Sequence, residues 1–318
     1  MIRRLALLAV ATPLLLIPAT ATAKPPDPSM LPMGDVPAVT WQSGTTVHTA
    51  GGKTVHLPLG KAGNAYEVLG KRKGEWIVGI PGYDHDHTRV LAVKGTKVRT
   101  VWKHVYDESG TDYTLARGGS LVVEWNYDRA GATTAVVFDL RGKVVARRHW
   151  GGGVNLLDFS GDTMLIRMWA DKTGLWSVPG KPVAVAPDAE YGDLDGDLLW
   201  VTLPQDSSGP TSLSAPGMPA WSSTTFHPEL LSPDGQYIAG RDFTNKYTLS
   251  VRQVVDGTEL PIPGFRFYAD STLTWEPDGS LLVEMRTASG HFLVRCTMAG
   301  VCTRTTAYVQ GRHLGFPA

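Results

Sequence analysis

The two cysteines of the chain stand close together near its C-terminal end. Cys296 and Cys302 are separated by five residues that include Gly300, and this spacing predicts a hairpin turn between two short strands. An even number of cysteines in an exported chain indicates a disulfide, and facing residues of an antiparallel pair are near enough to form one. The spacing is not Cys-x-x-Cys and no second pair accompanies it, which argues against a redox pair or a zinc site. We therefore predict a structural disulfide between Cys296 and Cys302.

A run of alternating aspartates has the residue types of a calcium loop. Asp193, Asp195 and Asp197 supply hard oxygen ligands at every second position. An EF-hand loop needs Gly at its sixth position and Glu at its twelfth, whereas here Gly196 is the fourth residue and Pro204 the twelfth. We therefore favour a plain Asp-Gly turn over a calcium site.

A second candidate metal segment contains two histidines. His85 and His87 alternate with aspartates in residues 84–87, so in an extended chain both imidazoles would point the same way and share a metal with a distant third ligand. The same groups also titrate near physiological pH. No partner motif rich in His or Glu accompanies them elsewhere in the chain, so a solvated loop is the favoured interpretation.

Catalytic signatures are missing from the sequence. It contains no Gly-x-Ser-x-Gly elbow, and Ser160 stands at a turn without the upstream glycine. Glu75, Glu124 and Glu284 are candidates for a carboxylate pair across a central channel, although the sequence does not show that any two of them converge. We assign no catalytic residue, no metal and no cofactor. The ten tryptophans would suit an aromatic ligand platform, but packing of Trp76, Trp200 and Trp275 between structural units is the favoured interpretation.

The elements that would position these residues form a repeat. Turn glycines recur at positions 74, 119, 161, 196, 235 and 279, and each one precedes an apolar run such as Leu281-Leu282-Val283. A turn and a strand that return about every 40 residues indicate the blades of a β-propeller, an all-β fold with four antiparallel strands in each blade. The continuous apolar strand after each turn is predicted to be the innermost strand of its blade.

The number of blades depends on the start of the chain. The stretch from Ala38 to Trp41 reads as another inner strand, and residues 45–57 read as a hairpin. Counting this copy gives seven blades, and rejecting it gives six; we favour seven. We assign residues 36–318 to the propeller, and we expect the two chain ends to meet in one blade or between adjacent blades, because closure removes exposed strand edges.

The N-terminal residues have the pattern of a signal peptide. Arg3 and Arg4 precede an apolar stretch from Leu5 to Ile17, and Ala21 and Ala23 form a cleavage site of small residues. We predict a signal peptide over residues 1–23 and a Pro-rich linker over residues 24–35, with an uncleaved membrane anchor as the alternative. No later segment is apolar and long enough to span a membrane. The expected location is secreted or in the cell envelope.

Cleavage would leave 28 basic and 30 acidic residues, a net charge of −2. A nearly neutral chain argues against nucleic acid or an anionic membrane as the main partner, because both require concentrated positive charge. The densest basic run, Lys71 to Lys73, falls at a turn and is interpreted as solvated.

Two of the turns carry a family resemblance. Leu231 to Gly235 (Leu-Ser-Pro-Asp-Gly) and Trp275 to Gly279 (Trp-Glu-Pro-Asp-Gly) resemble the repeat of TolB-like and WD40-like propellers. The Gly-His and Trp-Asp dipeptides of WD40 repeats are missing, so the TolB-like side is nearer. The Gly-rich chain with its single cysteine pair also looks like secreted propellers of actinobacteria.

The resemblance indicates a fold and leaves the function open. We expect an exported, non-catalytic module that binds a protein, peptide or glycan. The alternatives are a hydrolase or lyase that acts on polysaccharide at the channel, and a structural part of the envelope. The binding site is expected in segments that do not repeat, above all residues 84–87 and 205–226.

Overall fold

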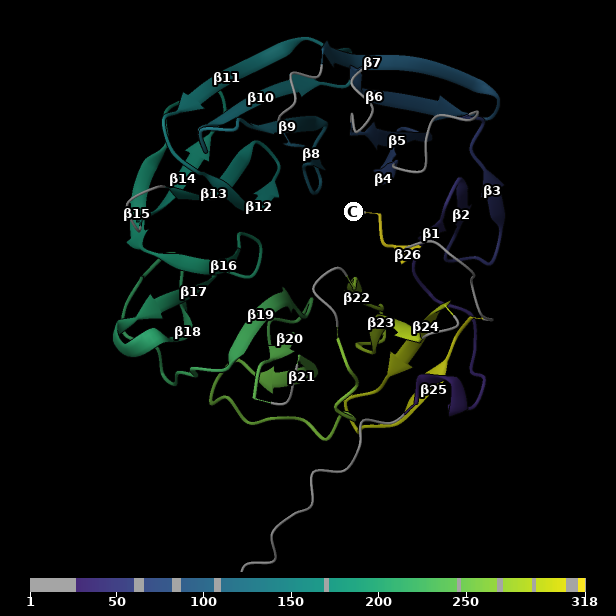
Figure 1. Cartoon of the computed structure of the whole chain (residues 1–318), viewed down its shortest axis with the longest axis vertical. Helices are drawn as coiled ribbons and strands as arrows, with labels where there is room; N and C mark the ends of the chain where they lie inside the picture. Colours follow the sequence, from purple (N-terminus) through teal and green to yellow (C-terminus); the bar gives the residue numbers. More distant parts are fainter. Residues whose placement is uncertain are drawn as a thin grey trace, which may run out of the picture.

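The computed structural model shows seven antiparallel sheets arranged in a ring around a central channel (Figure 1). It describes residues 27–59, 66–81, 87–105, 110–168, 172–244, 247–267, 271–287, 290–306 and 314–317. The seven-bladed, all-β propeller predicted from the repeat is therefore confirmed. Among the described residues, no helix has the length and apolar character that a membrane span requires.

The first four blades each contain four strands. From the channel outward they are as follows: blade 1, β26 (Leu314–Gly315), β1 (Trp41–Ser43), β2 (Thr46–His48) and β3 (Thr54–His56); blade 2, β4 (Glu67–Arg72), β5 (Glu75–Ile80), β6 (His87–Lys94) and β7 (Lys97–Val105); blade 3, β8 (Gly110–Leu115), β9 (Leu121–Tyr127), β10 (Thr133–Asp139) and β11 (Val144–Trp150); blade 4, β12 (Asn155–Ser160), β13 (Thr163–Met168), β14 (Lys172–Ser177) and β15 (Val183–Pro187).

In blades 5 and 6 the fourth position is occupied by irregular chain. Ser223 bridges Ser208 beside the third strand of blade 5, and Glu259 bridges Arg252 beside the third strand of blade 6. The strands and two short 3-10 helices of this half of the ring are as follows: blade 5, β16 (Ala189–Asp193), β17 (Leu198–Leu203) and β18 (Ser207–Ser212); blade 6, β19 (Phe226–Leu231), β20 (Tyr237–Asp242) and β21 (Thr248–Gln253); blade 7, β22 (Leu273–Trp275), β23 (Leu281–Thr287), β24 (Gly290–Cys296) and β25 (Cys302–Arg304); with η1 (Pro28–Met30) and η2 (Pro204–Asp206) outside the sheets.

The prediction of the innermost strand is wrong by one position. Each apolar strand that follows an Asp-Gly turn, such as β9 or β23, is the second strand from the channel, and a shorter strand lies inside it. The second strand is the most apolar because both of its edges are paired and both of its faces pack on neighbouring blades. For the same reason β1, at the end of the stretch from Ala38 to Trp41, is the second strand of blade 1 and β26 is the innermost.

The core is divided among the interfaces between blades. The described buried residues form seven apolar clusters, and each cluster joins one pair of neighbouring blades around the ring. In the cluster between blades 7 and 1, Leu314 of β26 packs with Trp41, Leu282 and Leu293. The ring is thus held together by side chains that alternate between the two faces of each sheet.

Both ends of the described chain take part in ring closure, as expected. β26 pairs with β1 through Gln42 and Ser43, so the last strand completes the first blade. At the other end, Met33 forms a parallel bridge with Arg304 of β25. The guanidinium of Arg304 donates to the carbonyl of Leu31, and that of Arg295 donates to the carbonyls of Asp35 and Val36. The described part of the predicted linker therefore lies along blade 7.

Candidate functional site

The Asp-Gly turns, which lie at one face of the ring, carry side chains that cross from blade to blade. Arg117, in the turn between β8 and β9 of blade 3, donates to Asp158 of blade 4 and to Asp193 of blade 5. Burial alone would lower the pKa of Arg117, but the hydrogen bond to Asp193 and the charges of the three surrounding aspartates raise it. The guanidinium, with Asp195 as its third acidic neighbour at 3.4 Å, therefore stays charged and joins three consecutive blades.

Similar contacts connect other blades on this face. Arg72 of blade 2 donates to the carbonyls of Ala116 and Gly119 in blade 3 at 2.8 Å each. The hydroxyl of Tyr191 in blade 5 accepts from the backbone of Leu231 in blade 6. A Cβ on Gly119 would lie 2.6 Å from the carbonyl oxygen of Gly161, so the turns of blades 3 and 4 can approach only because that residue is glycine. These turns brace the ring.

Asp193 and Asp195 take part in this bracing, whereas Asp197 holds residues beside β18 in its own blade. Asp193 and Asp195 surround Arg117, and Asp197 accepts from the hydroxyls of Ser212 and Ser214. No group of three or more described His, Cys, Asp or Glu residues is arranged to hold a metal ion. The plain turn, favoured over the calcium loop, agrees with these contacts.

The three candidate catalytic glutamates lie on different strands, and none of them lines the channel cavity described below. Glu124 is fully buried and accepts from Thr88, Trp102 and Tyr113, at the interface of blades 2 and 3. Glu284 is fully buried in blade 7, where His291 and the backbone of Leu314 contact it. Glu75 forms a surface ion pair with Arg99 at 3.0 Å. None of the three faces another of them in a carboxylate pair.

The tryptophans pack between blades, as favoured from the sequence. Trp200 is fully buried, donates to the hydroxyl of Ser208 at 2.7 Å and meets Trp221 edge to face. Trp76 and Trp275 are each 7% exposed. No described tryptophan is exposed, and the chain therefore presents no indole platform in the part that the structure describes. Ser160 is also structural, because its hydroxyl donates to Asp195.

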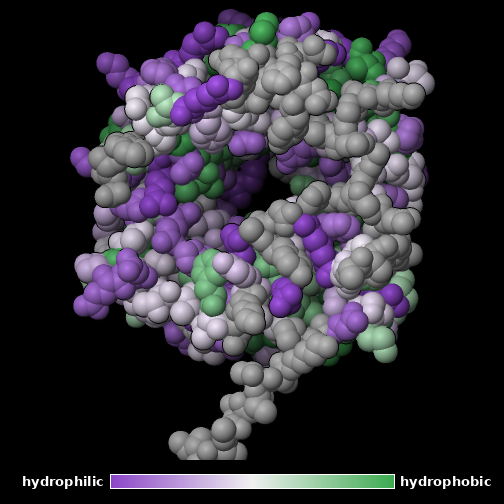
Figure 2. Space-filling model, viewed as in Figure 1, coloured by the Kyte–Doolittle hydropathy of each residue, from purple (hydrophilic) through white to green (hydrophobic). Residues whose placement is uncertain are grey.

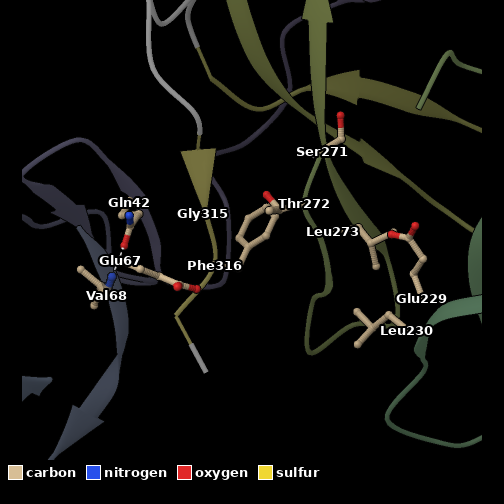
Figure 3. Close-up of a pocket in the computed structure, with 10 residues that line it drawn as sticks. All are labelled: Gln42, Glu67, Val68, Glu229, Leu230, Ser271, Thr272, Leu273, Gly315 and Phe316. Carbon is tan, nitrogen blue, oxygen red and sulfur yellow. Dashed lines mark hydrogen bonds between the residues drawn. The ribbon is translucent and has the colours of Figure 1, made fainter. Parts of the chain in front are cut away.

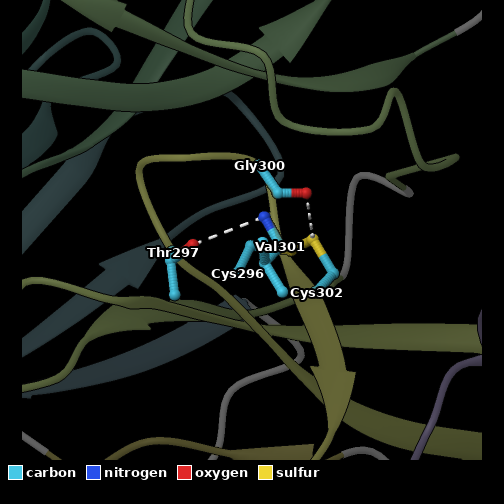
Figure 4. Close-up of a disulfide and its surroundings, with 5 residues drawn as sticks. All are labelled: Cys296, Thr297, Gly300, Val301 and Cys302. Atoms are coloured by element: carbon cyan, nitrogen blue, oxygen red, sulfur yellow. Dashed lines mark hydrogen bonds between the residues drawn. A yellow bond between two sulfur atoms is a disulfide. The ribbon is translucent and has the colours of Figure 1, made fainter.

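The cysteines face each other across the last hairpin of blade 7. Cys296 of β24 and Cys302 of β25 are directly paired, and their sulfur atoms lie 2.09 Å apart. The turn between them is closed by a hydrogen bond from the backbone of Val301 to the hydroxyl of Thr297 at 3.3 Å (Figure 4). The pair holds together the outer edge of the blade along which the N-terminal segment lies.

The structure describes only part of the two loop segments in which the binding site was expected. Residues 84–86, which include His85, lie outside the described part of the chain, and His87 begins β6. Residues 205–226 contain β18 and then return along blade 5, where the indole of Trp221 donates to the carbonyl of Val254 in blade 6. Trp221 of the second segment therefore packs between two blades, whereas residues 214–218 of that segment are exposed.

The innermost strands enclose a polar channel. Figure 2 shows an opening at the centre of the ring with hydrophilic residues on its wall. A cavity of about 290 Å³ lies in this wall between blades 1, 2, 6 and 7. Figure 3 shows Glu67 and Glu229 on opposite sides of the cavity with Phe316 between them. The other lining residues are Gln42, Val68, Leu230, Ser271, Thr272, Leu273 and Gly315.

Among the residues that line the cavity, Glu67 has a strongly shifted pKa. Its carboxylate is open to water at the start of β4, but protein surrounds it on the other sides. Desolvation, with a smaller contribution from the negative charge of Asp112 on the neighbouring strand β8, raises the pKa of Glu67 to about 7. Burial also raises the pKa of Asp112. Neither carboxylate has an ion pair or hydrogen bond with a side chain in the described ranges.

The remaining acids of the inner strands already have partners. Glu229 pairs with Arg241, and Glu190 lies 3.4 Å from the imidazole of His227. Ser271, by contrast, is 94% buried in the cavity wall, and its hydroxyl has no hydrogen-bond partner among the residues that the structure describes. An unpaired buried hydroxyl and two unpaired carboxylates are groups that a bound ligand would satisfy.

Sequence reasoning missed the channel residues. Glu67, Asp112 and Glu229 all lie on innermost strands, before the apolar runs that defined the repeat. The available signal was an acid on the strand that enters the turns of blades 2, 3 and 6, but these strands were not identified as the innermost ones.

No protein-family model and no curated relative matches the chain. Solved structures do match it. TolB from Acinetobacter baumannii is 9% identical with a TM-score of 0.50, and the match covers 85% of this chain and 60% of TolB, so the chain spans about 60% of the length of that protein. The WD40 propeller of Doa1 is 9% identical with a TM-score of 0.51, covering 78% of this chain and 82% of the domain.

A third match has a printed enzyme name. A putative 6-phosphogluconolactonase from Bacteroides fragilis is 14% identical with a TM-score of 0.57, and the match covers 88% of this chain and 98% of that protein. At these identities the likeness concerns the fold alone. The chain is a seven-bladed β-propeller whose solved structural neighbours include the TolB and WD40 propellers.

Proposed function

We propose that the protein is an exported, non-catalytic binding module that takes a cationic segment of a protein partner into its central channel. The observation that carries the proposal is the pair of unpaired carboxylates, Glu67 and Asp112, on adjacent innermost strands. Like charges held together in a partly desolvated wall repel each other, and a cation between them would relieve that repulsion.

The channel suits a peptide better than a glycan. Binding sites for sugars commonly present several exposed aromatic rings, whereas the described tryptophans are buried or partly buried and none of them lines the cavity. The cavity wall instead offers carboxylates, the hydroxyl of Ser271 and the ring of Phe316. A lysine or arginine side chain has both the charge and the apolar stem that such a wall accepts.

The other face of the ring offers less charge to a ligand. A cavity of about 370 Å³ lies among the Asp-Gly turns, lined in part by Arg117, Asp193 and Asp195. Those three residues already satisfy one another. A ligand would have to break the brace between blades 3, 4 and 5 in order to use them.

Export is part of the proposal. The signal-peptide pattern of residues 1–23, the cysteine pair and the propeller fold shared with TolB all support a location outside the cytoplasm. Cleavage after Ala23 would leave a new N-terminus four residues before η1.

Site-specific crosslinking from intact cells tests the function. A photo-reactive phenylalanine at Phe316 would report on the channel, and the same group at Val183, which is 63% exposed on β15, would serve as the matched control. We expect a discrete crosslinked partner from position 316 only, lost when Glu67→Gln and Asp112→Asn are combined. Identical products from both positions would contradict the proposal.

One observation favours the alternative of a channel hydrolase or lyase. Burial raises the pKa values of both Glu67 and Glu229, and the two residues line one cavity from opposite sides, which is an arrangement that acid–base chemistry uses. Against it, Glu229 pairs with Arg241. Degradation of a polysaccharide by the purified protein, abolished by Glu67→Gln, would establish the enzyme instead.

A further inference from the structure

The charges of the chain are segregated around the ring, although its formal net charge is zero. Residues 87–150, in blades 2 and 3, contain 11 Lys and Arg against six Asp and Glu. Residues 188–284, mainly in blades 5 to 7, contain four Lys and Arg against 15 Asp and Glu. The zero net charge therefore combines a strongly basic side, in blades 2 and 3, and a strongly acidic side, mainly in blades 5 to 7.

The basic side chains concentrate at the outer edge of the ring. The outermost strands β7 and β11 lie next to each other along the circumference (Figure 1). Arg99 of β7 donates to the carbonyl of Leu140 beside the turn that leads into β11, so the two edges are in contact. The exposed cations here, which we call the basic rim, are Arg89, Lys94, Lys97, Arg99, Lys103, Arg141, Lys143 and Arg147.

Within the described part of the chain, most of the basic rim has no counter-charge. Arg99 pairs with Glu75, and no other cation of the rim forms an ion pair with a described residue. The strand register also places like charges opposite each other: Arg89 faces Lys103, and Lys94 faces Lys97. Like charges in facing positions destabilise a sheet, so these two facing pairs cost the fold stability.

Protection of exposed strand edges does not account for the rim. Charged side chains on an outer strand do prevent edge-to-edge pairing. Three other outermost strands, β3, β15 and β25, nevertheless carry between them a single Lys or Arg, Arg304, which contacts Leu31 within the fold. The number of positive charges on the outer strands of two adjacent blades is larger than protection of the strand edges requires.

We propose that the basic rim binds a linear polyanion, a polymer with repeating phosphate or carboxylate groups. By the strand register, Lys97 and Arg99 lie on the face of blade 2 that packs on blade 3, about 6.6 Å apart along β7, and Arg147 of β11 lies on the face of blade 3 that packs on blade 2. The neighbouring edges of β7 and β11 therefore present cations from facing sides to an extended chain. A bilayer is the less suitable partner, because peripheral membrane binding adds aromatic or long apolar anchors to basic charge. The exposed apolar side chains on the two strands are the short valines Val98, Val105 and Val144.

This inference goes beyond the proposed channel function, because it concerns a different surface and a different class of ligand. The channel is acidic and would take a cationic segment, whereas the rim would hold the module on an anionic matrix. Loss of one activity should leave the other intact, so the two proposals can fail separately.

Binding of fluorescently labelled long-chain polyphosphate and of polygalacturonate, measured by anisotropy, tests the rim. We expect binding of at least one polymer and a loss of about tenfold or more in affinity between 50 and 200 mM salt, because bound counterions are released. Lys97→Glu with Arg147→Glu should weaken binding by about tenfold or more at constant salt. Neutral dextran should not bind.

Matched controls separate a local effect from net charge. Lys172→Glu with Arg266→Glu changes the net charge equally, on exposed residues of blades 4 and 6, and should change the affinity by less than about twofold because neither site belongs to the rim. Glu67→Gln should leave polymer binding unchanged. Circular dichroism and thermal denaturation would confirm that each variant is folded.

Several outcomes would overturn the proposal. Failure to bind either polymer would do so, as would equal losses in the rim variant and the matched control. Binding only to vesicles that contain anionic lipid would identify a membrane surface instead. Sedimentation at low salt that shows self-association, lost in the rim variant and without polymer binding, would identify the acidic side of a second copy as the occupant.

Discussion

Arg117 donates a hydrogen bond to Asp193 at 3.2 Å, although the two residues belong to blades 3 and 5 and blade 4 lies between them. Asp158 of blade 4 accepts a hydrogen bond from the same guanidinium, so Arg117 contacts both blades at once. A single planar group with several donors thus ties together three blades that are separate sheets. This bracing adds charged contacts to the apolar interfaces of the ring.

Replacement of Arg117 by Ala should destabilise the fold. The change leaves Asp158 and Asp193 largely buried without their cation, and we expect a loss of about 1 to 3 kcal/mol, less than for a fully buried pair because the guanidinium is 37% exposed. Urea denaturation followed by tryptophan fluorescence measures it. Arg99→Ala, which breaks an exposed ion pair with Glu75 and an exposed hydrogen bond to the carbonyl of Leu140, should cost about 1 kcal/mol or less. Equal losses would show that the contacts of Arg117 stabilise the fold no more than exposed ones do.

The closing strand should be sensitive to loss of one side chain. Leu314 is 1% exposed and packs against Trp41, Leu282 and Leu293. Leu314→Ala removes this contact between blades 7 and 1 and should lower the free energy of unfolding by about 2 to 5 kcal/mol. Val301→Ala, at a site that is 62% exposed, should change it by less than about 0.5 kcal/mol. A similar small effect at Leu314 would mean that β26 does not close the ring.

Mass spectrometry of the exported protein should find no free thiol at Cys296 or Cys302. Replacing both by Ser opens a short loop and should lower the free energy of unfolding by about 2 kcal/mol through the entropy of the unfolded chain. The difference should disappear when both proteins are unfolded in the presence of a reductant. Two free thiols in protein secreted by intact cells would refute the disulfide.

Stability should depend on pH through Glu67. Its pKa of about 7 in the folded protein lies above the ordinary value of 4.5, so the folded state binds this proton more tightly than the unfolded state. The contribution is therefore favourable below about pH 4.5 and is lost as the pH rises to about 7. Glu67→Gln should remove this part of the decline, as measured by urea midpoints at pH 5 and pH 8.

A second variant identifies the cause of the shift. Asp112→Asn removes the neighbouring negative charge that contributes to the raised pKa and should move the decline to lower pH. If both variants keep the wild-type difference between pH 5 and pH 8, Glu67 does not titrate in the channel as described.

The repeat predicted the architecture because a turn and an apolar strand are local features. Gly74, Gly161, Gly235 and Gly279 all fall at the predicted turns and have φ values between 59° and 81°, which glycine adopts readily. The seven-blade count also followed from spacing. The position of the apolar strand within the blade could not be predicted from this spacing. An apolar run is compatible both with a strand that has two paired edges and with a strand beside the channel.

The candidate site was predictable only in part. Cys296 and Cys302 are near in sequence, so their pairing followed from spacing. Glu67 and Glu229 are separated by more than half the chain, and only closure of the ring brings them to one cavity. Glu124 and Glu284 drew attention as acids in apolar runs, but hydrogen bonds from buried partners, which the sequence does not display, account for them.

The pairing of β26 with β1 has a consequence for biosynthesis. Ribosomes make the chain from its N-terminus, so Trp41 and its neighbours emerge first and their inner partner, Leu314–Gly315, emerges last. The circle cannot be completed until residues 314–315 have been made, and until then the first blade has an open edge. Any chain that stops early is released as an incomplete arc with exposed backbone, a natural substrate for chaperones and proteases.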